Sequence, residues 1–465
     1  MRCRQVLSID MLPDDVLLSI FELCADGRLH SERAIEEWWQ SLVHVCRRWR
    51  TVVFGSPRRL NLRLACSPRT PAGDTLDVWP AYPLAISSYH SSTKGKLDNM
   101  LAALEHRHRV CQIRLVDLSI CQMEKVLAAM QVPFPELTEL VFQVMSADDI
   151  AVVPDSFLAG SAPLLRHFTT FHLPFPGLPK LLLSATHLAT LRLSEIPHSG
   201  YFSPESLLSA LSVCTSLRHL SLTFQSPRSC PDQARPPPPP SERIVLHALT
   251  DVLFVGASEY LEDLVAGIDA PVKDLGVVLF NDIVLDTPQL VQFISRTPTL
   301  KSYEKNCLFL GTEVARVLLS SQTTSHYGQF KMDMQCCGLE WQVSFLEQIC
   351  TLFMPFHPKL EDLSITLTLS DLDRLNKIEN TLWLELLRPF TAVKKFELSG
   401  LAAQSIVPAL QELVEDSDRT TEVLPALENI ILRDSEPELE PQAVQEGIWQ
   451  FVAARQAIGH HITTN

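Results

Sequence analysis

The residues best suited to chemistry lie in one short stretch, LVHVCRRWRTVVFGSPRRLNLRL, at residues 42–64. Arginine beside an aromatic ring is a combination that proteins use to hold nucleic acid, and a cysteine beside a cation is a common nucleophile. This stretch offers both, because Cys46 directly precedes Arg47 and the arginines surround Trp49. The arginines are Arg47, Arg48, Arg50, Arg58, Arg59 and Arg63.

The charge around this stretch argues against nucleic-acid binding. The whole chain has a formal net charge of -15, and acidic residues such as Asp14, Glu22 and Glu36 share the region with the arginines. A protein that reads a duplex needs a basic face across its binding domain, which this region lacks. Cys46 falls on an apolar helical stripe, so we interpret it as a small packed residue and not as a nucleophile.

Other signatures of catalysis or metal binding are missing from the sequence. It contains no GxxxxGK[ST], GxGxxG, GxSxG or HExxH motif. His106 and His108, and the pair His460–His461, lack cysteines or carboxylates at the spacing of metal ligands. The sequence therefore predicts no enzyme activity, no cofactor and no metal site.

The cysteines and the apolar runs predict a cytoplasmic and/or nuclear protein. The twelve cysteines include no CxxC pair, and the adjacent Cys336 and Cys337 are poorly placed for a relaxed disulfide. We therefore expect free thiols in a reducing compartment. No signal peptide is apparent, and no apolar run reaches the roughly 20 residues of a membrane helix, so no membrane contact is expected.

The arginines must be positioned by helices on either side of them. In DMLPDDVLLSIFELC, apolar residues recur at helical spacing from Leu12 to Cys24, with Pro13 and two acidic residues at the start. A second apolar stripe runs from Trp38 to Val53, and GSP at 55–57 ends it. Residues 1–56 are predicted to form a short helical module, which is either an internally satisfied helical hairpin or a module that shares part of its apolar surface with a partner.

These two segments together resemble the F-box. The likeness covers residues 12 to about 54, with Leu-Pro, an acidic residue, an aliphatic pair and Ile-Phe, then Val-Cys-basic-basic-Trp. The resemblance implies that the helices dock on the Skp adaptor of a cullin ubiquitin ligase, with the arginine stems covering apolar surface. The implied adaptor-binding residues are Leu12, Pro13, Val16, Leu17, Ile20, Phe21, Leu42, Val45, Cys46 and Trp49.

Beyond residue 100 a short unit recurs, with apolar residues at its first, fourth and sixth positions. Each unit predicts a strand that buries these residues, and a helix or turn that returns the chain to the next strand. Helical runs such as 203–214 and 287–298 lie between the units. The units are VCQIRL (110–115), LTELVF (137–142), LATLRL (188–193), LRHLSL (217–222), LTDVLF (249–254), VKDLGV (272–277), LEDLSI (360–365), VKKFEL (393–398) and LENIIL (427–432).

This pattern is similar to leucine-rich repeats. Two segments, PSERIVLHALTDVLFVGASEYLEDLVAGIDAPVKDL (240–275) and DTPQLVQFISRTPTL (286–300), also resemble F-box proteins of mushroom-forming (basidiomycete) fungi, and this resemblance spans most of the chain. The predicted fold class is α/β: a short helical F-box module followed by an irregular leucine-rich-repeat solenoid, a curved parallel sheet with outer helices. The predicted divisions are the module at 1–56, a connector at 57–100, the repeats at 101–446 with a Pro-rich insertion at 227–241, and a capping helix and tail at 447–465.

In each unit, the residue between the last two apolar positions and the one after them are expected to point outward. Stacked strands would then carry a ladder of small polar groups that suits an extended polar client protein. The client-binding residues that this geometry predicts are Arg192, Ser194, Ser221, Thr223, Ser364, Thr366, Glu397, Ser399 and Arg433, together with the outward Ile431.

The functional expectation is a substrate-recognition subunit of an SCF-type ligase. The module would hold the Skp adaptor and, through it, the cullin core, while the repeats would hold an unidentified client near the ligase. Two alternatives stay open at this point: a Skp-binding scaffold that does not cause degradation, and a cytosolic ligand sensor built on leucine-rich repeats.

Overall fold

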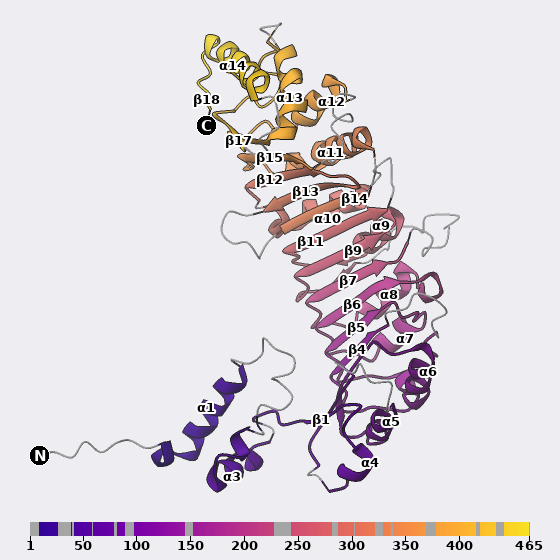
Figure 1. Cartoon of the computed structure of the whole chain (residues 1–465). Helices are drawn as coiled ribbons and strands as arrows, with labels where there is room; N and C mark the ends of the chain where they lie inside the picture. The colour runs from indigo at the N-terminus through magenta and orange to yellow at the C-terminus, as the bar shows by residue number, and fades with distance from the viewer. Residues whose placement is uncertain are drawn as a thin grey trace, which may run out of the picture. The chain divides into compact units, whose positions relative to one another are not determined.

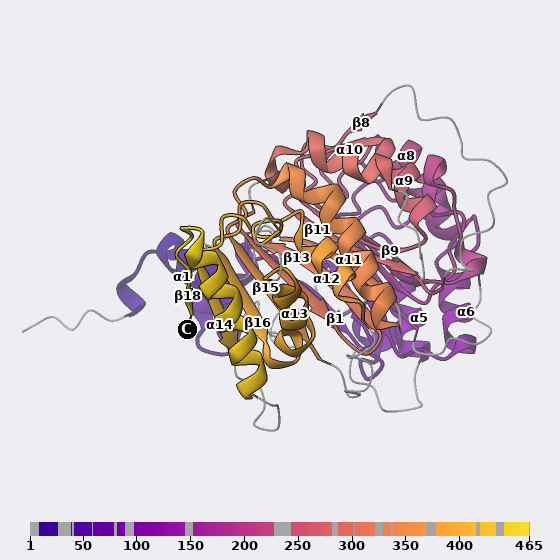
Figure 2. The same cartoon turned by 90° about the horizontal axis from the view of Figure 1, so that it is seen from above.

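The computed structural model describes residues 9–26, 39, 41–57, 59–78, 81–88, 97–144, 152–226, 243–280, 287–301, 303–320, 329–335, 338–368, 378–414, 419–433 and 441–464. They form an α/β protein with a long, mostly parallel sheet of 16 strands flanked by helices (Figures 1 and 2). The chain divides into two compact units, Met1–Leu188 and Ala189–Asn465, and this boundary falls inside the predicted repeat region.

Two short helices begin the first unit. After η1 (Ile9–Met11), α1 (Asp14–Asp26) starts behind Pro13 with two carboxylates in its first turn, where the helix dipole favours them. Next, α3 (Arg47–Gly55) starts at Arg47, because Cys46 has an extended backbone and its Sγ accepts the backbone N–H of Trp49 at 3.4 Å. The prediction of one helix across 38–53 is therefore wrong, since residues 44–46 separate α3 from helical residues 41–43.

The rest of the first unit alternates strands with helices. All of its strand pairings that we describe are parallel, β1 with β2, β2 with β3, β3 with β4 and β4 with β5. Two of these strands lie within the predicted connector, 57–100. The elements are β1 (Leu64–Cys66), α4 (Ala72–Thr75), β2 (Leu84–Ser87), α5 (Leu97–Glu105), β3 (Val110–Val116), α6 (Ile120–Ala129), β4 (Glu139–Gln143), η2 (Phe157–Gly160), β5 (His167–Phe171) and α7 (Leu178–Leu182).

The second unit continues the alternation with longer elements. Its helices lie on one face of the sheet, and consecutive helices pack side by side (Figures 1 and 2). A separate two-stranded sheet pairs β8 (Ile244–Val245) with β10 (Ile268–Asp269). The other elements up to residue 301 are β6 (Thr190–Ile196), η3 (His198–Gly200), α8 (Pro204–Leu211), β7 (His219–Phe224), β9 (Asp251–Gly256), α9 (Ser258–Ala266), β11 (Asp274–Phe280), α10 (Pro288–Arg296) and η5 (Pro298–Lys301).

The remaining elements run to the C-terminus of the second unit. They include one helix of 15 residues, α11, and a C-terminal helix of 17 residues, α14. The elements are β12 (Lys305–Leu310), β13 (Val314–Ser320), β14 (Gln329–Gln335), α11 (Leu339–Phe353), η6 (Met354–Phe356), β15 (Asp362–Leu367), α12 (Asn380–Leu387), β16 (Lys395–Ser399), α13 (Gly400–Glu412), β17 (Asn429–Arg433), α14 (Pro441–Ala457) and β18 (Thr463–Thr464).

Each of the nine recurrent apolar units coincides with a strand, and the prediction that their apolar residues point inward is confirmed with two exceptions. In LRHLSL, the side chains of Leu217, Leu220 and Leu222 are all at most 2% exposed. Val252 and Leu432 are only half-buried. The alternation follows from the pleat of a strand, which sends successive side chains to opposite faces.

Several strands were missed because they lack this pattern. In β5, buried Thr170 takes the place of the third apolar residue. In β12, buried Asn306 stands between the buried Tyr303 and Leu308, at the position where the pattern has an apolar residue. The strand β13 is antiparallel to both of its neighbours, β12 and β14. A connection of residues 311–313 is too short for the crossover that parallel strands require. The prediction of a wholly parallel sheet is therefore wrong at β13.

A helix covers the C-terminal end of the second unit, as the sequence predicted, although α14 begins at Pro441 and not at 447. It packs on α13 at Gly447, where a Cβ atom would lie 2.4 Å from Cγ1 of Val407 and 2.9 Å from Cδ of Gln411. The chain then adds an unpredicted strand, β18, parallel to β17. Glycine at position 447 therefore sets how closely the two helices approach.

We expect Gly447→Ala to destabilise the second unit. The added methyl group forces α14 away from α13, and such overpacking typically costs about 1–3 kcal/mol. Thermal unfolding of the full chain, followed by circular dichroism and calorimetry, measures the effect. The control is Gly73→Ala, since a Cβ atom at Gly73 meets nothing within 4 Å. An unchanged melting temperature for Gly447→Ala would contradict the packing described.

Candidate functional site

The first candidate surface begins with the core of the N-terminal helix pair. Leu17 and Phe21 of α1 and Val53 of α3 are at most 1% exposed. The rings of Phe21 and Trp49 pack with centroids 4.8 Å apart in a tilted arrangement. These contacts hold the two helices together, so they leave little of Leu17 or Phe21 for a partner.

A second set of apolar side chains on this helix pair faces outward. Met11 is 63% exposed, Val16 39%, Leu23 70% and Val45 58%. Val16 and Leu23 are seven residues apart and so share one face of α1, roughly opposite Leu17 and Phe21. Exposed apolar groups that gather in this way are typical of interaction surfaces. We name Met11, Pro13, Val16, Leu23 and Val45 the N-terminal apolar surface.

Two arginines join the residues after Val45 to α1. Three residues after Val45, the Arg48 guanidinium lies 2.7 Å from the Asp14 carboxylate and also donates to the Leu12 carbonyl oxygen. Arg59 forms a similar contact with Glu22, at 2.6 and 3.1 Å, and this hydrogen bond lowers the pKa of Glu22 below its ordinary value. Both arginines therefore join α3 and the residues after it to α1.

Other arginines of the stretch are also engaged within the first unit. Arg50 donates to the Val43 carbonyl at 3.0 Å, and Arg63 donates to Oε1 of Gln112 at 2.6 Å. Arg47 is exposed, and Arg58 lies outside the described residues. Cations used for internal contacts are poorly placed to track a phosphate backbone, so the geometry favours a structural role for most of them.

The structure separates the predicted adaptor-binding residues into two groups. The expectation that all ten face a partner is wrong for Leu17 and Phe21, which are buried. Cys46 is half-buried and caps α3. Sequence reasoning missed Met11 and Leu23, although Leu23 continues the seven-residue spacing from Val16. The remaining predicted residues are exposed or half-buried: Leu12, Pro13, Val16, Ile20, Leu42, Val45 and Trp49.

The second candidate surface lies on the face of the sheet away from the helices, within the second unit. Parallel strands in register place Arg192, Ser221, Leu253 and Gly276 side by side, followed by Lys331 on β14. Around this row is a depression of about 450 Å³. We name it the sheet-face depression; its lining residues include these five and His219, Asp251, Asp274 and Gln329.

Several charges around the sheet-face depression are paired internally. Nδ1 of His219 lies 3.2 Å from the Asp251 carboxylate, and Asp274 accepts the backbone N–H of Gln329 at 3.0 Å. Nζ of Lys331 lies 3.0 Å from the Asp333 carboxylate, which is also contacted by Arg316 at 2.8 Å. Arg192 is exposed, and within the described residues its side chain makes no hydrogen bond or ion pair.

Most predicted client-binding residues are accessible, but two are not. Glu397 and Ser399 are each 8% exposed, so the expectation that they face solvent is wrong. Glu397 forms an ion pair with Arg433, and Ser399 Oγ accepts the backbone N–H of Leu367 at 3.1 Å. Arg433 itself is exposed, and the others are exposed or half-buried: Arg192, Ser194, Ser221, Thr223, Ser364, Thr366 and Ile431.

The predicted ladder of small polar groups is interrupted by apolar residues. Leu253 is 42% exposed on the outward face of β9, and half-buried Val255 and Val278 stand at the next outward level of β9 and β11. Sequence reasoning passed over Leu253 because it listed outward positions in only five of the nine units, and LTDVLF (249–254) was not one of those five. The accessible face therefore combines an apolar centre with charged surroundings.

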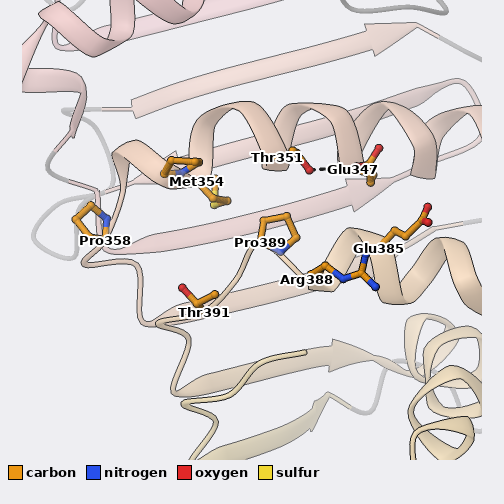
Figure 3. A pocket seen from close by; sticks show the side chains of 9 residues that line it. Glu347, Thr351, Met354, Pro358, Glu385, Arg388, Pro389 and Thr391 are labelled. Atoms are coloured by element: carbon orange, nitrogen blue, oxygen red, sulfur yellow. Dashed lines mark hydrogen bonds between the residues drawn. The ribbon is translucent and has the colours of Figure 1, made fainter. Parts of the chain in front are cut away.

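A groove of about 700 Å³ lies on the helical side between α11 and α12 (Figure 3). Prolines line it at positions 355, 358 and 389, and Thr351 donates a hydrogen bond to Glu347 at 3.1 Å. The guanidinium of Arg388, which also lines the groove, is paired with Glu422 at 2.5 Å. Arg388 is thus already neutralised, and the groove follows the junction of two neighbouring helices.

No protein-family model matches the chain, and no curated protein matches its sequence. Among the described residues, no group of three or more His, Cys, Asp or Glu side chains is arranged to hold a metal ion. In the same part of the chain, every helix is too short or too polar to cross a membrane. The predicted Pro-rich insertion, 227–241, lies outside the described residues.

We expect Phe21→Ala to unfold the N-terminal helix pair without disturbing the sheet. Removing a buried aromatic side chain costs about 3–5 kcal/mol, more than two short helices can lose. Hydrogen–deuterium exchange of the full chain should show faster exchange in residues 14–26 and 47–55 only. Val16→Ser is the control, because its exposed side chain contributes little to packing. Unchanged exchange in Phe21→Ala would contradict the core described.

Proposed function

We propose that the protein is a substrate-recognition subunit of an SCF-type ubiquitin ligase, acting in the cytoplasm and/or the nucleus. In this proposal residues 1–56 are an F-box that docks on a Skp-family adaptor, and the strand–helix units are leucine-rich-repeat-like units that hold a protein client. The observation that carries the proposal is the N-terminal apolar surface, which lies on the same segment whose sequence resembles the F-box.

Two further features support this proposal. The helix pair is braced from within by Arg48 and Arg59, so its outward apolar groups are held in place before a partner arrives. In the described part of the second unit the helices lie on one face of the sheet, and the sheet-face depression lies on the other face (Figure 2). Such a protein needs no active site, because it works by raising the concentration of the client near the ligase.

We expect the double substitution Met11→Ser with Val16→Ser to prevent adaptor binding. Truncating an interface hot spot typically costs roughly 2 kcal/mol or more, which is about thirtyfold in affinity. Calorimetry with the full chain and a purified Skp adaptor measures the loss. The control is Leu253→Ser, an exposed apolar residue on the sheet, which should bind the adaptor normally. Normal binding by the double variant would refute docking through this surface.

Arg47 offers a separate test of electrostatic steering. Its exposed guanidinium is not used to join α1 and α3, so Arg47→Glu should leave the helix pair folded. If the adaptor is acidic at the interface, association should slow several-fold at low salt, and the difference should fade at high salt. Stopped-flow mixing at two salt concentrations measures the rate. An association rate that does not change with the substitution would remove Arg47 from the interface.

Client half-life distinguishes this proposal from a scaffold that binds the adaptor without causing degradation. Proteins captured on the full chain should accumulate when the Met11→Ser/Val16→Ser variant replaces the natural protein, because capture continues while the ligase is lost. If their half-lives do not change, the scaffold alternative is favoured.

A further inference from the structure

The sheet-face depression has a row of outward positions that differ in chemistry from strand to strand. Starting at β6, the row holds Arg192, Ser221, Leu253, Gly276 and Lys331 in register. A Cβ atom on Gly276 would lie 2.9 Å from Cδ1 of Leu253, so the leucine side chain covers the backbone of Gly276. The centre of the depression is therefore an apolar platform, with a cation at each end of the row.

The two ends are positively charged in different ways. Arg192 is exposed, and within the described residues its side chain makes no ion pair. Lys331 and Arg316 share the single carboxylate of Asp333, which leaves one positive charge in excess at that end. Anionic side chains are the complement of both ends.

The acidic residues of the depression are held by the protein itself. Asp251 pairs with His219, and Asp274 accepts a backbone N–H from Gln329. Asp251 and Asp274 are the first residues of β9 and β11, and each lies two residues before the row that contains Leu253 and Gly276. Their negative charge would repel a polyanion such as nucleic acid, whereas single anionic groups placed at the ends of the row avoid them.

The strand spacing sets the length of a matching ligand. Neighbouring strands lie about 4.8 Å apart, so Arg192 and Leu253, two strands apart, are separated by roughly 10 Å, and Leu253 and Lys331 by the same distance. An extended peptide advances about 3.3 Å per residue, so roughly 10 Å corresponds to about three residues. If a peptide lies across the strands, its residues that contact Arg192, Leu253 and Lys331 are therefore two or three positions apart in the peptide.

We propose that the sheet-face depression binds an extended client peptide in which an apolar side chain, seated on Leu253 above Gly276, is flanked two or three residues away by anionic side chains that pair with Arg192 and Lys331. This proposal rests on the proposed function only for the consequence of binding, which is delivery to a ligase. The anionic group is a carboxylate or a phosphate, which share this chemistry.

Selection from a displayed library of random twelve-residue peptides on the immobilised full chain tests the proposal. Peptides with an aspartate or glutamate two or three residues from a large apolar residue should be enriched. On Arg192→Glu, acidic residues should disappear from the position on that side of the apolar residue and basic residues should replace them. The matched control is Lys305→Glu, an exposed lysine in β12 outside the depression, which should select the same peptides as the natural chain.

Synthetic copies of the enriched peptides, with glutamate, glutamine or phosphoserine at the anionic position, then separate the two sources of charge. Glutamine should weaken binding about tenfold, as expected for loss of a charged hydrogen-bond partner, and Arg192→Glu should remove the preference. Failure to enrich any peptide, enrichment of basic peptides, or an acidic preference that survives Arg192→Glu would overturn the proposal.

The adaptor titration run on the same preparations keeps the two proposals apart. Peptide selection that depends on Arg192, together with no Skp binding, would sink the ligase function and leave the peptide site intact. Normal Skp binding without a preference for acidic peptides would overturn the peptide site and leave the proposed ligase function intact.

Discussion

Burial of alternate strand residues beneath a layer of helices is the constraint on which the rest of the structure depends. Each strand contributes only two or three apolar side chains, such as Leu220 and Leu222 of β7, and burying each is worth about 1.5–3 kcal/mol. That is too little to offset the entropy of ordering a whole strand and helix. A single unit is therefore unstable, and the units must pair strand to strand. One face of the sheet is covered by this packing, so the outward residues, which differ from strand to strand, lie on the opposite face.

The N-terminal helix pair has a small apolar core and is held together in part by ion pairs. Its described core consists of a few residues around Phe21 and Trp49, fewer than an independent domain of this size usually has. Arg48 and Arg59 add contacts between segments more than thirty residues apart in the chain, to Asp14 and Glu22. Exposed ion pairs of this kind are each weak, but they fix orientation. These contacts join the two helices while the outward apolar side chains Met11, Val16, Leu23 and Val45 remain exposed.

The outer face of the second unit shows how charge can be kept on a sheet without excess repulsion. Neighbouring strands place groups of opposite charge beside each other, as Arg316 of β13 and Asp333 of β14 do. Cross-strand pairs of this type add modest stability. Arg192 is exposed, and among the described residues its side chain makes no ion pair. The exposed Leu253 lies in the same row of the sheet, between Arg192 and Lys331.

The sequence by itself determined the strands that carry the leading apolar residue, the inward direction of their leucines and the positions of α1, α8 and α10, because these depend on local periodicity and on Pro, Asp or Ser at helix starts. It did not determine β13, whose antiparallel direction follows from a short connection, nor β5, where buried Thr170 replaces an apolar residue. Only the tertiary structure decided which side chains are available to a partner. Glu397 and Ser399 occupy outward positions by period, yet they are buried because Arg433 and the backbone of Leu367 reach them from neighbouring strands. In the same way Phe21 is closed off by Trp49 of another helix while Leu23, two residues later, is left open. The exposure of a side chain depends on neighbours that are distant in the chain, and a local sequence pattern does not identify those neighbours.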